Sequence, residues 1–267
     1  MPIPHLLNPG SYTGSVIHRK RIDAILFSET LYVTGQYEGG LHCHENPHIS
    51  FVFQGGDVEK RNGRSYGRSA GDLFYYESGE HHQTVSRALL SRHLNIEFEK
   101  KFFIDNGICS NQIKRSLAEN LDSKFLVIKI LEELRYQDEN SKDYIEFLTL
   151  ELVSQAKKNL TTHIPNWVKN LSDLLNDRWD ENISLKELSS IIGVHPITIS
   201  KYFSKFFLCT YGEYMRKLKI DKSISLIRSS EMTLTEISYQ CGFVDQSHFI
   251  RNFKQFTGFL PKDFQRL

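Results

Sequence analysis

An internal repeat near the C-terminus is the feature that most constrains the fold of this 267-residue chain. Leu185–Gly193 (LKELSSIIG) corresponds to Leu234–Gly242 (LTEISYQCG), 49 residues further on. Ile199–Phe203 (ISKYF) corresponds to Phe249–Phe253 (FIRNF) at an offset of 50, so one additional residue lies between the two blocks of the second copy. Repetition of this kind indicates that one supersecondary unit occurs twice.

Capping residues mark where the first helix of each copy begins. Ser184 precedes Glu187 by three positions, and Thr233 precedes Glu236 by three positions. In such a capping box, the hydroxyl and the carboxylate each accept a hydrogen bond from the other residue's backbone N–H. The sequence therefore predicts one helix directly after Ser184 and another directly after Thr233.

A glycine ends each of these helices, and a second helix follows it. Gly193 and Gly242 stand where the chain must reverse, a position that often requires a positive φ. The second helices are predicted to start at His195-Pro196, because proline suits the first helical position, and at Asp245, a good N-cap. Two helices joined by a tight turn containing glycine form a helix-turn-helix unit, whose second helix enters the DNA major groove.

Each predicted pair of helices has an apolar face and a polar face. The apolar positions predict the packing core, and they are Leu188, Ile192, Ile199, Phe203, Ile237, Phe243, Phe249 and Phe253. The opposite faces of the second helices carry the candidates for base contacts, which are Ile197, Ser200, Lys201, Gln246, Ser247, His248 and Arg251. Arginine can pair bidentately with guanine, and glutamine with adenine. The candidates for phosphate contacts are Lys205, Arg216 and Lys254.

The stretch from Ser184 to Gln265 resembles the DNA-binding domain of the AraC/XylS family of bacterial transcription factors. The second copy carries the most specific residues: Glu236-Ile237-Ser238, Gly242-Phe243, Asp245, Ser247-His248-Phe249, Arg251, Phe253-Lys254, Gly258 and Pro261. Tyr211–Ile227 matches the connecting helix of that family. The chain departs from the family at Ser223 and Ser238 (alanine in the family), Lys219 and Gln265 (arginine), and Ser204 (a basic residue).

This resemblance implies a sequence-specific transcriptional regulator that binds double-stranded DNA and is not an enzyme. RNA polymerase is a further partner if the regulator is an activator. The charge distribution is consistent with DNA binding by the C-terminal part. Residues 166–267 carry 14 Lys and Arg against 11 Asp and Glu, whereas the remainder carries 19 Lys and Arg against 21 Asp and Glu. A mild positive excess in the C-terminal part is what a nucleic-acid-binding domain favours.

Short segments bounded by turn residues occupy the chain from Val16 to Phe98. Strands are predicted at Thr30–Tyr37, His48–Gln54 and Asp72–Glu77. Strands of this length and spacing indicate a sandwich or a barrel rather than a βαβ unit.

Helical periodicity replaces this pattern between Ile104 and Thr162, with helices predicted at Ser123–Arg135 and Lys142–Lys158. The second of these has an apolar stripe that predicts a homodimer. Thr161–Pro165 is the predicted linker, because Pro165 disfavours helix before it. The expected architecture is α+β: a sensing and dimerisation domain (1–162), consisting of a β-barrel with following helices, and an all-α DNA-binding domain (166–267).

The first domain resembles the cupin barrel that often precedes this DNA-binding module. The resemblance rests on His42-Cys43-His44, His48, Gly55-Gly56, Gly71, Gly79 and His82. In the cupin pattern, an HxH pair, a glutamate and a distant histidine bind a metal. Here His48 stands near the position of the glutamate, and Glu77 replaces a usual proline. The resemblance thus implies a metal or effector site formed by His42, His44, His48 and His82.

The alternation of side chains along a strand bears on this site. His42 and His44 share a face while Cys43 points away, and His48 has the same parity if the strand continues. Imidazole suits zinc, copper, iron and nickel, so one divalent transition metal is the candidate cofactor. The alternative is a pocket for an organic small-molecule effector, with the histidines beside Phe51, Phe53, Phe74 and Tyr76. His81 is predicted to lie on the surface.

Two other functions compete with regulation by DNA binding. One is a metal-dependent cupin enzyme with a helical appendage, although an enzyme has no use for two recognition helices. The other is a helical interaction module that does not bind DNA. The four cysteines lie far apart without a CxxC pair, and the sequence shows no signal peptide and no apolar run long enough to span a membrane. We therefore expect a cytoplasmic protein with reduced thiols and no membrane partner.

Overall fold

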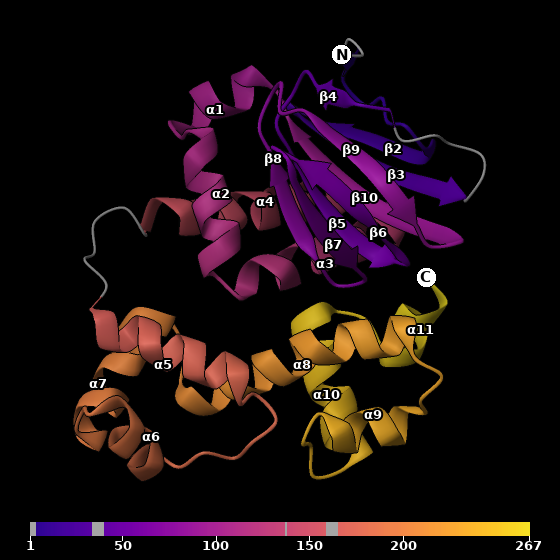
Figure 1. Ribbon diagram of the computed structural model, residues 1–267. Helices are drawn as coiled ribbons and strands as arrows, with labels where there is room; N and C mark the ends of the chain where they lie inside the picture. Colours follow the sequence, from indigo (N-terminus) through magenta and orange to yellow (C-terminus); the bar gives the residue numbers. More distant parts are fainter. Residues whose placement is uncertain (1–3, 34–39, 137, 159–164) are drawn as a thin grey trace. The chain divides into compact units, whose positions relative to one another are not determined.

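The computed structural model describes residues 4–33, 40–136, 138–158 and 165–267 (Figure 1). The chain divides into two compact units. The first contains Met1–Leu160 with the short segments Arg228–Ser230 and Lys262–Leu267, and the second contains Thr161–Ile227 and Glu231–Pro261. All described strands lie in the first unit, and helices follow them, so the protein is α+β as predicted.

The described strands form two five-stranded sheets, in the orders β1-β4-β9-β6-β7 and β2-β3-β10-β5-β8. The first sheet contains β1 (His5–Leu7), β4 (His42–His44), β9 (His82–Arg87), β6 (Gly56–Arg61) and β7 (Arg64–Ser69). The second sheet contains β2 (Ser15–Ile22), β3 (Ile25–Val33), β10 (Leu90–Phe98), β5 (His48–Gln54) and β8 (Leu73–Tyr76).

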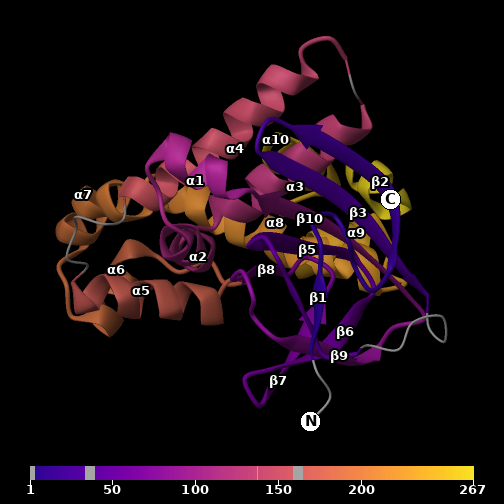
Figure 2. The same cartoon turned by 90° about the horizontal axis from the view of Figure 1, so that it is seen from above.

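The two sheets lie face to face (Figures 1 and 2), and side chains from both line one small cavity. In the part of the chain that the structure describes, hydrogen bonds between strands do not close the sheets into one barrel. The chain crosses from one sheet to the other between β5 and β6 at Gly55, which has a φ of +73°. A Cβ atom there would lie 2.0 Å from the carbonyl oxygen of Leu90, so only glycine fits this crossing.

Two of the three predicted strands are confirmed, as β5 and β8, but the start predicted for the strand Thr30–Tyr37 is wrong. The observed strand β3 begins at Ile25 and ends at Val33, and residues 34–37 lie outside the described residues. Every residue from Ile25 to Thr30 is buried, because one face of β3 is directed towards the other sheet and the opposite face towards α3. A strand buried on both faces lacks the alternation from which strands are predicted.

Four helices complete the first unit: α1 (Lys100–Asn106), α2 (Ser110–Glu119), α3 (Asp122–Arg135) and α4 (Ser141–Lys158). The two predicted helices are confirmed as α3 and α4, each beginning one residue earlier than expected. Both lie across the outer face of the β2-β3-β10-β5-β8 sheet (Figure 2). Except for Pro165, the predicted linker Thr161–Pro165 lies outside the described residues, so the domain limits at 162 and 166 stay predictions.

The C-terminal helices are α5 (Asn166–Asp177), α6 (Leu185–Ile192), α7 (Pro196–Phe207), α8 (Tyr211–Ser229), α9 (Leu234–Gln240), α10 (Gln246–Thr257) and α11 (Pro261–Arg266). The repeat corresponds to two helix pairs, α6–α7 and α9–α10. The predicted capping boxes are confirmed at Ser184 and Thr233, whose hydroxyls accept hydrogen bonds from the N–H groups of Glu187 and Glu236. Pro196 is the first residue of α7, and Asp245 caps α10.

The predicted core of these helices is confirmed with one exception. Seven of the eight apolar positions are buried, whereas Ile192, the last residue of α6, is half-buried. The buried Ser223 and Ser238 replace alanines of the resembling family, and their hydroxyls donate to the carbonyl oxygens of Ile220 and Thr235. Serine is tolerated at these positions because each hydroxyl hydrogen is satisfied within its own helix.

The turns of the two helix pairs share a backbone conformation but differ in their surroundings. Gly193 has a φ of +73° and Gly242 a φ of +67°, as expected for left-handed turn residues. A Cβ atom on Gly193 would meet open space, whereas one on Gly242 would lie 2.9 Å from Lys219 Nζ and 3.1 Å from the carbonyl oxygen of Asp180. The second turn is therefore packed more tightly than the first.

Alanine substitutions at Gly193 and Gly242 separate the cost of the left-handed backbone from the cost of close packing. Gly193→Ala should lower the free energy of unfolding by about 1 kcal/mol, since only the left-handed backbone is penalised. Gly242→Ala should cost roughly 1 kcal/mol more, because the new methyl group also displaces its neighbours. Urea unfolding followed by circular dichroism measures both, and equal losses in the two variants would contradict the packing described at Gly242.

Candidate functional site

The second helix of each pair carries most of the predicted DNA-contacting residues on its exposed face. In α7, Ile197 is 71% exposed, and Ser200, Lys201 and Lys205 are also exposed. In α10, Ser247, Arg251 and Lys254 are exposed. Gln246, His248 and, in α8, Arg216 are half-buried.

Local contacts distinguish the side chains of α10. The carbonyl oxygen of the Gln246 side chain accepts a hydrogen bond from the Thr235 hydroxyl at 3.1 Å, and the His248 ring packs edge-on against Phe243. Arg251, by contrast, makes no ion pair or hydrogen bond within the described part of the chain. Its guanidinium group is therefore available for a partner, which suits a base contact. The role of each residue on DNA stays a prediction.

An apolar residue that the sequence analysis did not single out lies beside these side chains. Val244, directly before the N-cap Asp245, is 81% exposed. It lies in a turn, where helical periodicity gives no indication of exposure. Exposed apolar groups of this kind can contact the methyl group of thymine.

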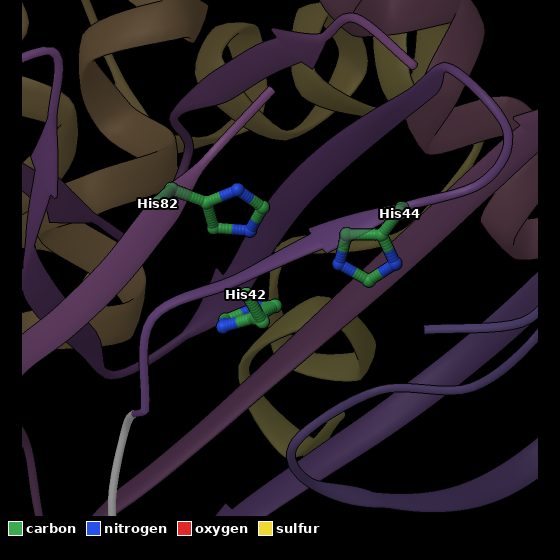
Figure 3. Close-up of side chains that lie close together, drawn as sticks. All are labelled: His42, His44 and His82. Carbon is green, nitrogen blue, oxygen red and sulfur yellow. The ribbon is translucent and has the colours of Figure 1, made fainter. Parts of the chain in front are cut away.

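Three of the four predicted histidines converge in the space between the two sheets (Figure 3). His42 on β4 pairs in register with His82 on β9, and His44 lies two residues further along β4 on the same face. All three are buried, and one nitrogen of each ring lies within 4.8 Å of the corresponding atoms of the other two. The interpretation that His42 and His44 share a face is consistent with this geometry.

Backbone carbonyl groups set the orientation of two of these rings. Nδ1 of His42 lies 2.8 Å from the carbonyl oxygen of Gly40, and Nδ1 of His82 lies 2.9 Å from that of Glu80. Each Nδ1 must carry the hydrogen, because a carbonyl oxygen can only accept. The lone pair of each neutral ring is then on Nε2. This arrangement is typical of metal-binding histidines, whose second nitrogen donates to a carbonyl or carboxylate group.

The three histidines are neutral near pH 7. Burial and, to a smaller extent, the neighbouring His82 lower the pKa of His42 to about 4. Burial likewise lowers the pKa of His44 to about 3 and that of His82 to about 4. Neutral imidazole is the form that binds a metal ion, so no proton has to be displaced at neutral pH.

The prediction that His48 shares the strand parity of His42 and His44 is wrong. The strand β4 ends at His44, the chain turns, and His48 opens β5 in the other sheet. His48 still approaches the site from across the gap: its ring centroid lies 4.4 Å from that of His44, and the ring stacks on Tyr76. It is not one of the three histidines whose nitrogens converge.

The aromatic residues expected beside the histidines are mostly elsewhere. Of the four predicted, only Tyr76 lines the cavity between the sheets. Arg92 and Arg135 pack over the ring of Phe53, which places it on the outer face of its sheet. His81 is exposed, as expected.

A buried charged cluster borders the histidines and was not predicted. Arg68 forms ion pairs with Asp57 at 2.5 Å and with Glu59 at 2.9 Å, and the Tyr76 hydroxyl donates to Glu59 at 3.0 Å. The sequence gives no signal for this cluster, because charged residues at alternate strand positions usually indicate a solvent-exposed face. The positive charge of Arg68 contributes to lowering the pKa of His42 and of His82.

The cavity between the sheets has a volume of only about 20 Å³. Such a space holds about one water molecule or one ion. In this conformation the space has the size of one ion and is too small for a sugar-sized effector.

Comparisons with known proteins agree with the description of the C-terminal helices. A family model described as a helix-turn-helix domain matches residues 188–267. The transcriptional regulator GbdR of Pseudomonas aeruginosa (strain UCBPP-PA14) is 27% identical over 107 residues, which are 40% of this chain and 29% of GbdR. The transcriptional activator RhaR of Cronobacter sakazakii is 25% identical over 239 residues, covering 83% of this chain and 84% of RhaR. The solved structure of ToxT from Vibrio cholerae covers 90% of this chain at 14% identity and a TM-score of 0.38.

The C-terminal part is thus a helix-turn-helix DNA-binding domain. This helix-turn-helix part is of the AraC type that the sequence predicts, and over most of its length the chain is similar to transcriptional regulators such as RhaR. Its relatives are regulators rather than enzymes, which argues against the alternative of a cupin enzyme with a helical appendage. No helix of the described residues is long and apolar enough to cross a membrane.

Proposed function

We propose that this protein is a sequence-specific transcriptional regulator whose DNA binding is controlled by an effector in its cupin-like first domain. The observation that supports it best is the second helix pair, which repeats the caps, glycine turn and core positions of the first. One recognition helix suffices for a simple DNA-binding module. Two recognition helices in one chain, joined by the 19-residue helix α8, are suited to contact two successive segments of the major groove.

The exposed side chains of α7 and α10 divide into two kinds of contact. We assign Ile197, Ser200, Lys201, Gln246, Ser247, His248 and Arg251 to base edges, and Val244 to a thymine methyl group. Lys205, Arg216 and Lys254 are assigned to phosphates, which add affinity without sequence information. RNA polymerase is the additional partner if the protein activates transcription.

Substitutions at Arg251 and Lys254 test this division. Arg251→Ala should cost about 1–3 kcal/mol of binding free energy and relax the preference at one base position. Lys254→Ala should weaken binding to all sequences alike and reduce the salt dependence of the affinity. The measurement is a binding titration of the full chain on a selected site and on single-base variants of it. Uniform weakening by Arg251→Ala would assign this arginine to a phosphate instead.

We further propose that the effector of the first domain is one divalent transition metal bound by His42, His44 and His82. The neutral rings, the Nε2 lone pairs fixed by the carbonyl groups and the ion-sized cavity support this proposal. A tetrahedral ion with metal–nitrogen bonds of about 2.1 Å requires ligand nitrogens about 3.4 Å apart. Binding would therefore draw the three rings together and the strands β4 and β9 with them.

Metal content tests the proposal. Protein purified without chelator should contain close to one transition metal per chain, and added metal should raise its melting temperature, because only the folded state offers the site. His44→Ala should abolish both effects. The matched control Cys43→Ser, in the same strand but on the opposite face, should leave them intact. The metal proposal is refuted if elemental analysis finds no metal and if added zinc, nickel or iron leaves the melting temperature unchanged. The histidines then belong to an organic-effector site.

We also propose that the protein is a homodimer formed through α4. One face of this helix packs inward, with Ile145, Leu148 and Leu152 buried. The other face exposes Tyr144, Phe147 and Leu150 to 43%, 57% and 49%. An apolar stripe of this kind on a domain surface favours association with a second copy.

Light scattering on the full chain tests dimer formation. Phe147→Glu should convert the dimer to a monomer, because a carboxylate would be buried without a partner in the interface. Val85→Glu, at an equally exposed apolar position on β9, should leave the dimer intact. A wild-type protein that is monomeric at tens of micromolar would contradict the proposal.

A further inference from the structure

A second and larger cavity lies in the first unit, on the outer face of the β2-β3-β10-β5-β8 sheet. Its volume is about 520 Å³, within the range of sites for small organic ligands. Residues of β2, β3 and β10 form one wall, and residues from the C-terminal end of α3 form the other. It is separate from the histidine site, because neighbouring residues of one strand point to opposite faces. Thr30 and His93 are directed inward, whereas their neighbours Glu29 and Leu94 line this outer cavity.

The walls combine an apolar surface with cationic groups. Phe27, Leu94, Leu131 and Leu134 provide the apolar part. Lys20 also lines the cavity, and its ammonium group forms no ion pair or hydrogen bond within the described residues. A lysine without a counterion beside a ligand-sized apolar space favours an anionic ligand.

The one carboxylate on the cavity wall is already neutralised. Glu29 accepts hydrogen bonds from Arg135 at 2.8 and 2.9 Å and also pairs with Arg92. Arg92 also donates to the carbonyl oxygen of Leu267. The carboxylate of Glu29 is therefore occupied by arginines and does not neutralise Lys20. In addition, Nε of Arg135 is buried without a hydrogen-bond partner in the described part of the chain. An unsatisfied guanidinium donor is a group that a ligand oxygen could satisfy.

We propose that this cavity binds a small organic anion that has an apolar body. Its carboxylate lies between Lys20 and Arg135, and its apolar body packs against Phe27, Leu94, Leu131 and Leu134. A cation would be repelled by the ammonium group of Lys20, and a neutral ligand would leave that group without a counterion. This site goes beyond the proposed function, in which the effector is a metal ion between the sheets.

Isothermal titration of the full chain with 4-phenylbutyrate tests the proposal, with 4-phenylbutylamine as the comparison of equal size and opposite charge. One molecule of phenylbutyrate should bind per chain, at least about tenfold more tightly than the amine, since the anion gains charge-assisted hydrogen bonds. Equal affinities of the acid and the amine, or no binding of the acid at millimolar concentration, would overturn the proposal.

Variants locate the binding site. Lys20→Met should weaken phenylbutyrate binding about tenfold, and Leu134→Trp should weaken it because the larger side chain alters the apolar wall. The matched control Lys60→Met, an exposed lysine of the other sheet, should change the affinity less than twofold. Unchanged binding in both Lys20→Met and Leu134→Trp would place the ligand elsewhere. Unaltered circular dichroism and melting temperature show that each variant is folded.

Discussion

The buried ammonium group of Lys219 is the interaction on which the arrangement of the two helix pairs depends. It lies on α8, only 6% exposed, and donates to the carbonyl oxygen of Gly242 at 3.0 Å and to the side chain of Asn182 at 3.3 Å. Gly242 belongs to the turn of the second pair, and Asn182 to the loop that leads into the first. One side chain thus connects both pairs to the helix between them. Burial lowers the pKa of this amine, and a buried polar group of this kind favours one arrangement over others rather than adding stability.

Helix α8 supplies the rigidity that this connection requires. Nineteen residues of α-helix extend roughly 28 Å, and nine of its residues are buried against neighbouring helices. In the proposed complex with DNA, α7 and α10 are held by this helix and do not adjust to DNA independently. Their spacing is a property of the protein, so it must match the repeat of the double helix.

The sequence predicts the C-terminal helices much better than the first domain, for a physical reason. The side chains of Ser184, Thr233 and Asp245 accept hydrogen bonds from backbone N–H groups three residues away, so these helix limits follow from local chemistry alone. The strand β3 is buried on both faces and loses the alternation that identifies strands. The convergence of His42 and His44 follows from strand parity, whereas His48 reaches the site only through a change of sheet. The Arg68 cluster and the outer cavity arise from residues that are distant in sequence, and no local pattern indicates them.

The central claim is that α7 and α10 of one chain contact two successive segments of the major groove. Hydroxyl-radical footprinting of the full-length protein, on a site selected from random DNA, tests it most directly. The structure predicts two protected patches for each chain, on one face of the duplex and about 10 base pairs apart. A single protected patch for each chain, or protection that does not depend on sequence, would contradict it.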